Sequence, residues 1–205
     1  MELDPRTTAL LAVHLQNDVV SAGGAFADFF HEQVVARDVV AVNADLIAAA
    51  RAAGVPVIYT RVAWKPDYSD LHANSPLLGM VAQFGCLKDG SPSAEIVAEV
   101  APTDGDHVVT HQRVGPFVDS PLQDLLKELG VSTLIVSGVA TNASVEATVR
   151  GASDHGYRTI LVEDGCSAGT LEAHQASVGS MGLLAEITTA AEVTQALGAT
   201  EGATA

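Results

Sequence analysis

Short apolar runs alternate along this chain with longer segments of helical periodicity, and this alternation restricts the fold more than any other feature. The runs hold few polar residues, as strands buried on both faces of a sheet do. They lie at residues 8–14, 56–62, 107–110, 133–137, 159–163 and 186–188. Strands that are separated by helices form parallel sheets with helices on both faces. The sequence therefore predicts a three-layer α/β fold with a parallel sheet of about six strands.

Four segments between these strands are expected to be helices, at residues 31–53, 121–129, 142–152 and 171–184. Gly54 and Gly130 follow two of them, at the position where glycine commonly ends a helix. In the first helix, Val35, Val39 and Leu46 belong to an apolar stripe that is expected to face the core. Residues 63–106 contain four prolines, so we expect a long excursion over the strand ends, where functional loops often lie.

No composition shift divides the chain, so we expect one domain over residues 1–205, with a frayed tail after Gly198. Asp and Glu number 25 against 10 Lys and Arg, which disfavours nucleic acids and anionic membrane surfaces as partners. No apolar run approaches the roughly 20 residues that cross a bilayer. Two cysteines make no disulfide framework, and no signal peptide is evident. We therefore expect a cytoplasmic protein with a small-molecule substrate.

Unusual polar residues stand where three of the expected strands end. The first strand ends at His14, the third is followed by His111, and Ser144 comes shortly after the fourth, where the chain runs into a helix. In open α/β sheets, ligands bind beyond the carboxyl ends of the strands. Two imidazoles and one hydroxyl are therefore expected to converge on one crevice.

Four stretches carry a resemblance to a known family. They are residues 9–19 (ALLAVHLQNDV), 108–117 (VVTHQRVGPF), 138–145 (GVATNASV) and 156–168 (GYRTILVEDGCSA). These stretches resemble the motifs of the isochorismatase-like hydrolases, also called cysteine hydrolases. The resemblance implies a Rossmann-like version of the α/β fold, a hydrolase of small metabolites that needs no cofactor, and assembly into homodimers or homotetramers.

The family's hydrolytic members use an Asp, a Lys and a Cys, and this chain differs at all three positions. The resemblance places His14 at the Asp, His111 at the Lys and Ser144 at the Cys. Cys166 lies in a different motif, whose cysteine is not the nucleophile, and is expected to be a buried apolar residue. The resemblance also implies a cis peptide bond between Val139 and Ala140, which directs backbone N–H groups at the substrate oxygen.

Four interpretations of this site remain open. In the preferred one, a histidine takes the proton of Ser144 and backbone N–H groups near Val139 and Ala140 stabilise the oxyanion, which fits hydrolysis of an amide, a carbamate or a related C–N bond. In the second, His14 as an imidazolium protonates a vinyl ether, as the family's Asp does in isochorismatases. In the third, the two histidines bind zinc with His72 or Asp18. In the fourth, the chain binds a ligand without catalysis. No metal is expected.

Five further residues are candidates for substrate binding: Gln16, Arg61, Trp64, Phe117 and Asn142. Arg61 is placed to pair with a substrate carboxylate, and the aromatic residues to wall an apolar pocket. Each also has a structural alternative. Gln16 can hold the turn after the first strand, Phe117 and Trp64 can anchor loops, and Asn142 can cap a helix.

Overall fold

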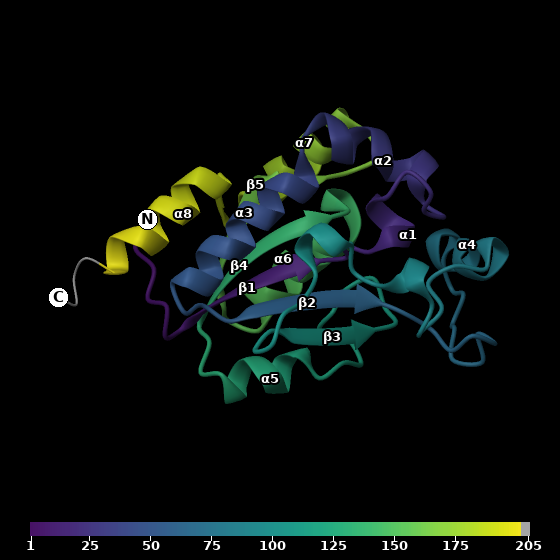
Figure 1. The fold of residues 1–205 in the computed structure, drawn as a ribbon, viewed down its shortest axis with the longest axis horizontal. Helices are drawn as coiled ribbons and strands as arrows, with labels where there is room; N and C mark the ends of the chain where they lie inside the picture. Colours follow the sequence, from purple (N-terminus) through teal and green to yellow (C-terminus); the bar gives the residue numbers. More distant parts are fainter. Residues whose placement is uncertain (202–205) are drawn as a thin grey trace.

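A computed structural model, which describes residues 1–201, contains one sheet of six parallel strands (Figure 1). The strands are β1 (Thr8–Val13), β2 (Val57–Val62), β3 (His107–His111), β4 (Thr133–Val139), β5 (Arg158–Ser167) and β6 (Glu186–Thr188). Their spatial order is β3-β2-β1-β4-β5-β6. All six predicted strands are present, and the predicted α/β fold with a parallel sheet is confirmed.

Helices cover both faces of this sheet. They are α1 (Asn17–Val20), α2 (Ala27–Ala36), α3 (Val39–Ala52), α4 (Pro76–Phe84), α5 (Leu122–Glu128), α6 (Glu146–Asp154), α7 (Leu171–Met181) and α8 (Ala190–Glu201), with short 3₁₀ helices at Pro92–Ala94 and Ala98–Val100. In β1, Leu10 belongs to the core cluster under α3 and α8, whereas its neighbour Leu11 belongs to the cluster under α5 and α6. This alternation is why the strands are apolar on both faces.

The helix predicted over residues 31–53 is in fact two helices. Asp38 adopts a left-handed conformation with φ 50° and separates α2 from α3. The adjacent Arg37 turns toward β5, where Nε donates to the carbonyl of Cys166 and Nη2 donates to the carbonyl of Glu163 and to its carboxylate, all at 2.9 Å. Because the break rotates α2 relative to α3, Val35 is 58% exposed, contrary to the prediction that it belongs to the core stripe.

Other helix boundaries also differ from the prediction. The segment predicted as a helix from residue 142 starts with a π-helical turn, Thr141–Val145, and only then becomes α6. The helix predicted to reach residue 184 ends at Met181. α8 was not predicted and continues to Glu201, past Gly198 where the tail was expected to fray. Residues 202–205 of that expected tail lie outside the described residues.

The first part of the excursion (residues 63–106), which includes α4, lies at the carboxyl ends of the strands, as predicted. Its last part returns to the amino end of β3, where Arg51 of α3 bonds the Ala101 carbonyl and Asp106. Figure 1 shows α1 and α4 at the end of the sheet to which the arrowheads of β2 and β3 point. The side chain of Ser75 caps α4 by accepting from the N–H of Leu78, Pro76 occupies the first turn, and Gly85 ends the helix with φ 66°. In the described part of the chain, no helix is long and apolar enough to cross a membrane.

Candidate active site

The first strand delivers His14 to the carboxyl edge of the sheet. β1 stops at Val13, and His14 takes a left-handed backbone conformation with φ 50°. Its backbone N–H still donates to the carbonyl of Thr60 on β2, at 2.9 Å. The His14 side chain is buried and faces the ring of His111, which is the last residue of β3. Two strands that are not neighbours in the sheet thus bring their imidazoles together.

The two rings form a histidine pair (His14 and His111), with a hydrogen bond of 2.9 Å between their Nε2 atoms. Nδ1 of His111 lies 2.8 Å from the carbonyl oxygen of Arg113. A carbonyl only accepts, so Nδ1 of His111 carries the proton and its Nε2 is an acceptor. Nε2 of His14 must then be the donor. This assignment leaves the Nδ1 lone pair of His14 as the free base of the pair.

Burial keeps the histidine pair neutral. Desolvation, with the neighbouring His111 as the second cause, lowers the pKa of His14 well below its usual 6.5. Desolvation also lowers the pKa of His111 to about 4, although its hydrogen bond to the Arg113 carbonyl acts in the opposite direction. Both imidazoles are therefore uncharged near neutral pH.

His14 and Ser144 line one small cavity of about 60 Å³ beside the carboxyl ends of β1 and β4. Trp64 and Arg113 also line it, whereas His111 stands behind His14 and does not. The other lining residues are apolar and come from α1, α2, α4 and the strand ends: Val19, Phe26, Phe30, Val62, Leu77, Leu78, Val81, Leu87, Val114, Val139, Ala140 and Ala143. The cavity suits a largely apolar ligand that carries a few polar groups.

The 138–145 turn carries Ser144 from β4 into α6. At its start Gly138 has φ 117°, and a Cβ there would lie 2.1 Å from the carbonyl oxygen of Val13, so only glycine fits beside β1. The Val139–Ala140 peptide bond is cis, as the family resemblance implies. The backbone N–H of Ala140 donates to no acceptor among the described residues, and the Oγ of Ser144 has no hydrogen-bond partner among them either.

A hydrogen-bond network supports this turn from behind. Nε2 of His174, on α7, donates to the Glu163 carboxylate at 3.2 Å, so its Nδ1 accepts from the Thr141 hydroxyl at 2.8 Å. Ser177 donates to the Thr141 carbonyl at 3.1 Å and is also bonded to Glu146, at 2.6 Å. Desolvation lowers the pKa of His174. Nothing in the sequence pattern of α7 marks these residues, because their partners lie in distant segments.

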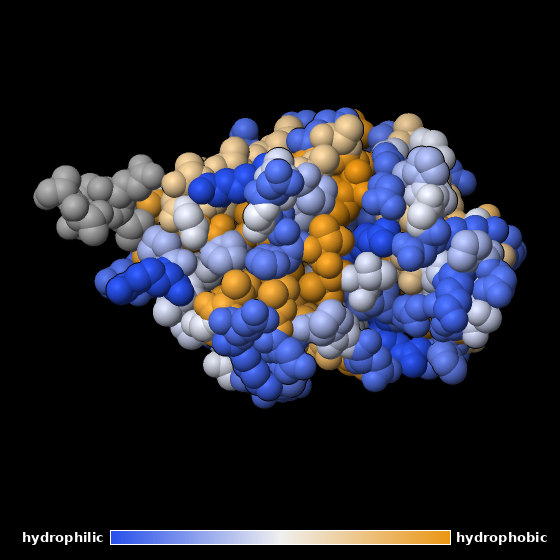
Figure 2. Space-filling view, turned by 60° about the horizontal axis from the view of Figure 1, so that its bottom comes forward, coloured by the Kyte–Doolittle hydropathy of each residue, from blue (hydrophilic) through white to orange (hydrophobic). Residues whose placement is uncertain are grey.

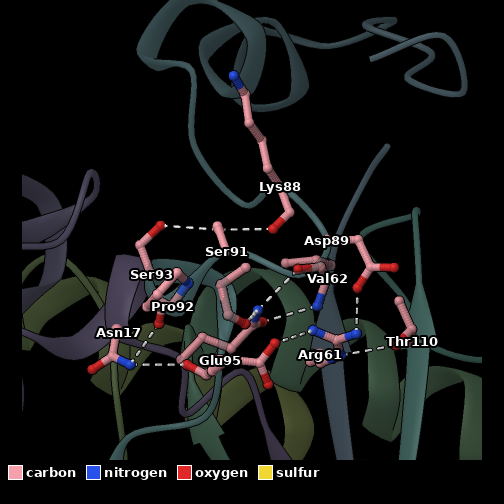
Figure 3. Close-up of polar contacts among 12 residues, drawn as sticks. Asn17, Arg61, Val62, Lys88, Asp89, Ser91, Pro92, Ser93, Glu95 and Thr110 are labelled. Carbon is pink, nitrogen blue, oxygen red and sulfur yellow. Dashed lines mark hydrogen bonds and ion pairs between the residues drawn. The ribbon is translucent and has the colours of Figure 1, made fainter. Parts of the chain in front are cut away.

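Two of the predicted substrate-binding residues hold the excursion to β2 instead of lining the cavity. The Gln16 side chain is fully buried, accepts from the N–H of Val62 and donates to the carbonyls of Val62 and Ala94. Figure 3 shows the Arg61 guanidinium among three partners. They are Asp89 at 2.6 Å, Thr110 at 2.9 Å and Glu95 at 3.3 Å. Neither side chain lines the cavity, so both have a structural role in holding the excursion.

Of the remaining three candidates, one lines the cavity and two lie outside it. Trp64 lines the cavity, and its buried Nε1–H has no hydrogen-bond partner among the described residues. Phe117 packs against His155 and Tyr157, with ring centroids 5.0 and 6.2 Å apart, and does not line the cavity. Asn142 is exposed and makes no capping hydrogen bond. The structure therefore gathers His14, Ser144 and Trp64 with the turn, and leaves Phe117 and Asn142 outside.

The family model described as "Isochorismatase domain" matches residues 8–192. The chain belongs to the isochorismatase family. It is 33% identical over 192 residues to the ureidoacrylate amidohydrolase RutB of Methylobacterium radiotolerans, covering 87% of this chain and 74% of that one. The uncharacterized isochorismatase family protein YecD of Escherichia coli O157:H7 is 30% identical, over 87% of this chain and 89% of the relative.

Solved structures agree with this assignment. A cysteine hydrolase from Pseudomonas syringae pv. phaseolicola 1448A superimposes with a TM-score of 0.88 at 26% identity, and the match covers 97% of this chain and 96% of that chain. The protein is accordingly a hydrolase of the isochorismatase family. The fold and the enzyme class predicted from the four motifs are confirmed.

Neither cysteine of this isochorismatase family member is placed to act as a nucleophile. Cys166 is completely buried, its Sγ donates to the carbonyl of Val162 at 3.2 Å, and desolvation raises the pKa of its thiol to about 12. Cys86 is also a buried free thiol, and desolvation raises its pKa to about 11. Neither residue is among those that line the cavity, so Ser144 is the hydroxyl or thiol that the cavity offers.

The zinc interpretation lacks a third ligand in the described part of the chain. His, Cys, Asp and Glu side chains form no group of three there that could hold an ion. The Asp18 carboxylate, one of the two proposed third ligands, accepts instead from the N–H of Leu87 at 2.8 Å and of Ala25 at 3.4 Å. It thereby fastens the excursion to α1.

Sequence reasoning missed one polar residue of the cavity, Arg113. It stands two residues after His111 and thus directly beyond the end of β3. Arg61, near the end of the neighbouring β2, carried the same signal, and the sequence pattern did not distinguish the two arginines. Considering every charged residue within a few positions of a strand end would have added Arg113 to Arg61.

Proposed function

We propose that this enzyme hydrolyses the C–N bond of a small amide, carbamate or ureido compound, with Ser144 as nucleophile and His14 as base. The observation that carries the proposal is that Ser144 and His14 line one cavity with Ala140, whose N–H has no acceptor in the described part of the chain. A nucleophile, a base and an oxyanion donor are the parts that acyl transfer needs. The relative named as a ureidoacrylate amidohydrolase supports the choice of a C–N bond.

In the first half of the reaction, the Ser144 oxygen attacks the carbonyl carbon and its proton passes to Nδ1 of His14. The backbone N–H of Ala140 donates to the oxyanion that forms. Collapse of this intermediate breaks the C–N bond, and His14 returns the proton to the departing nitrogen. In the second half, water attacks the acyl-serine, His14 takes a proton from this water, and the acid leaves as Ser144 regains its hydrogen.

His111 is the positioning residue of this scheme. By accepting from Nε2–H of His14, it fixes the tautomer whose Nδ1 lone pair is free. The lowered pKa of His14 makes its protonated form a stronger acid than an ordinary imidazolium, which favours transfer of the proton to the departing nitrogen, and makes its neutral form a weaker base toward Ser144. The same lowered pKa disfavours the vinyl-ether interpretation, since that reaction requires His14 to be protonated before the substrate reacts.

We further propose that Trp64 contacts the substrate through its ring, because its side chain lines the cavity whereas its Nε1 is buried. The apolar side chains of α2 and α4 would then enclose the remainder of the substrate.

The decisive experiment compares Ser144→Ala with Ser180→Ala, an exposed serine of α7 that lies outside the cavity. Purified proteins are assayed against a panel of short carboxamides, carbamates and ureido compounds. Ser144→Ala is expected to lose at least about 10³-fold in kcat/KM with an unchanged circular dichroism spectrum and melting temperature, and Ser180→Ala to retain full activity. Mass spectrometry of the quenched wild-type enzyme should show an acyl group on Ser144. Full activity of Ser144→Ala would refute the nucleophile.

Two proposals concern the setting of this chemistry. We propose that the enzyme is cytoplasmic, which agrees with two buried cysteines that form no disulfide.

We also propose a homodimer or homotetramer. Apolar residues gather in the middle of the face shown in Figure 2, with hydrophilic residues around them, and Val108 on the edge strand β3 is 46% exposed. Light scattering coupled to gel filtration gives the mass, and a monomer at micromolar concentration would refute the assembly.

A further inference from the structure

The cavity carries one permanent charge in an otherwise uncharged wall. Among the described residues that line it, only Arg113 is ionised near neutral pH, since His14 is neutral and the wall includes no Asp, Glu or Lys. This composition contrasts with the whole chain, in which 25 acidic residues outnumber 10 basic ones. The cavity wall is otherwise almost wholly apolar, and its one ionised residue favours an anion over a cation.

The guanidinium of Arg113 is also poorly satisfied. Its Nε and Nη2 share one oxygen of Asp119, each at 3.3 Å, and Asp119 has a side chain that is 72% exposed. Its Nη1 has no hydrogen-bond partner among the described residues. In contrast, Arg61 engages all three of its nitrogens, and Arg158 does so at 2.7 to 2.9 Å. A long ion pair with an exposed carboxylate is weak and is readily exchanged for a better partner.

The backbone of Arg113 belongs to the catalytic arrangement. Its carbonyl accepts the Nδ1–H of His111, which in turn holds His14. The backbone at Arg113 is therefore held beside the histidine pair. The wall contributed by α2 and α4, with Phe30 and Leu78, is apolar. A ligand that fits both walls has an apolar body and an anionic group on the side of the histidine pair.

We propose that Arg113 binds a carboxylate of the substrate, so that the enzyme acts on amides, carbamates or ureido compounds that are themselves acids. This inference rests on the proposed function and names the substrate class of the same site. A guanidinium binds a carboxylate through two parallel hydrogen bonds, and an apolar surrounding strengthens charge-assisted bonds of this kind. The exchange of partners releases Asp119 to solvent, where its charge is hydrated.

Matched pairs of compounds test this assignment. N-carbamoylglycine and N-carbamoyl-β-alanine are compared with their methyl esters, which keep the ureido group and lose the charge. The wild-type enzyme is expected to prefer each acid over its ester. In Arg113→Gln, kcat/KM for the acids is expected to fall about 10- to 100-fold further than kcat/KM for the esters, with the difference in KM.

Two variants serve as controls. Arg61→Gln removes an arginine that pairs with two carboxylates outside the cavity, so the acid-to-ester ratio is expected to remain that of the wild type. Asp119→Asn removes the competing carboxylate, so this ratio is expected to rise. Equal rates for acids and esters in the wild type, or an unchanged ratio in Arg113→Gln, would overturn the assignment.

Calorimetry separates this proposal from the proposed reaction. Binding of the two acids is measured to Ser144→Ala and to the Ser144→Ala, Arg113→Gln double variant, neither of which requires turnover. Binding that is lost with Arg113 supports the carboxylate site, even where the wild-type enzyme hydrolyses none of the compounds and the proposed reaction fails. Absence of measurable binding of both acids to Ser144→Ala counts against the site.

Discussion

Replacing His111 by glutamine is expected to weaken the dependence of folding stability on pH. His111 is 1% exposed, and burial lowers its pKa in the folded protein to about 4, against 6.5 for an unperturbed histidine. Between these two pH values the unfolded chain binds more protons than the folded one. The contribution of His111 is thus fully present above about pH 6.5, and it is lost progressively as the pH falls toward 4.

The size of this effect follows from the pKa difference. Each pH unit of separation corresponds to about 1.4 kcal/mol, so the whole span from 6.5 to about 4 amounts to about 3 kcal/mol. Between about pH 7 and about pH 5, the folded protein should lose about 2 kcal/mol of unfolding free energy through His111 alone. The carboxylates titrate in wild type and variant alike, and burial, which is the larger cause of the lowered pKa of His14, is retained in the variant, so the difference between the two proteins reports mainly the His111 imidazole.

Urea unfolding followed by circular dichroism, at about pH 7 and about pH 5, measures this difference. The wild type should lose about 2 kcal/mol more than His111→Gln over this interval. His72→Gln, which removes an exposed histidine of the excursion, should behave as the wild type does. Equal pH dependence in wild type and His111→Gln would refute the reasoning, because it would mean that His111 is not held in its neutral form by the fold.

Two further predictions concern the turn and the thiols. Gly138→Ala should lower the unfolding free energy by about 3 kcal/mol or more, since the new Cβ meets the carbonyl of Val13, whereas Gly179→Ala, on an open face of α7, should raise it by about 0.5–1 kcal/mol. Thermal melting distinguishes the two outcomes. Cys86 and Cys166 should resist a thiol reagent at about pH 8 until denaturant is added, and rapid labelling of the native protein would contradict their raised pKa values.

The strands were predictable from sequence because each of them is buried on both faces, which leaves a continuous apolar run. The break between α2 and α3 was not predictable from the sequence, because the residues that Arg37 contacts are far away in the chain. Arg37 leaves the helix in order to reach Glu163 and Cys166, and no local pattern records such a contact. α4 is a different case. Ser75, Pro76 and Gly85 are ordinary helix signals, but the prolines and glycines around them favoured an irregular segment.

The candidate site likewise contains residues that the sequence predicted and residues that it did not. The motifs identified the positions of His14, His111 and Ser144, since residue type and strand position are local properties. The direction of a side chain beyond a strand end is set by the partners that it finds. Arg61 meets the acidic residues of the excursion and stays outside the cavity, whereas Arg113 meets only one exposed carboxylate. Sequence alone does not reveal such a choice between partners.

The interruption between α2 and α3 is connected by hydrogen bonds to the turn of Ser144, the proposed nucleophile, although neither Arg37 nor Asp38 lines the cavity. Hydrogen bonds lead from Arg37 to Glu163, from Glu163 to His174, and from His174 to Thr141 in the turn that carries Ser144. These four positions are spread over more than half of the sequence, yet their side chains form one continuous series of hydrogen bonds. Each of these side chains has the next one as a hydrogen-bond partner, so the effects of substitutions at the four positions are expected to be coupled and not additive.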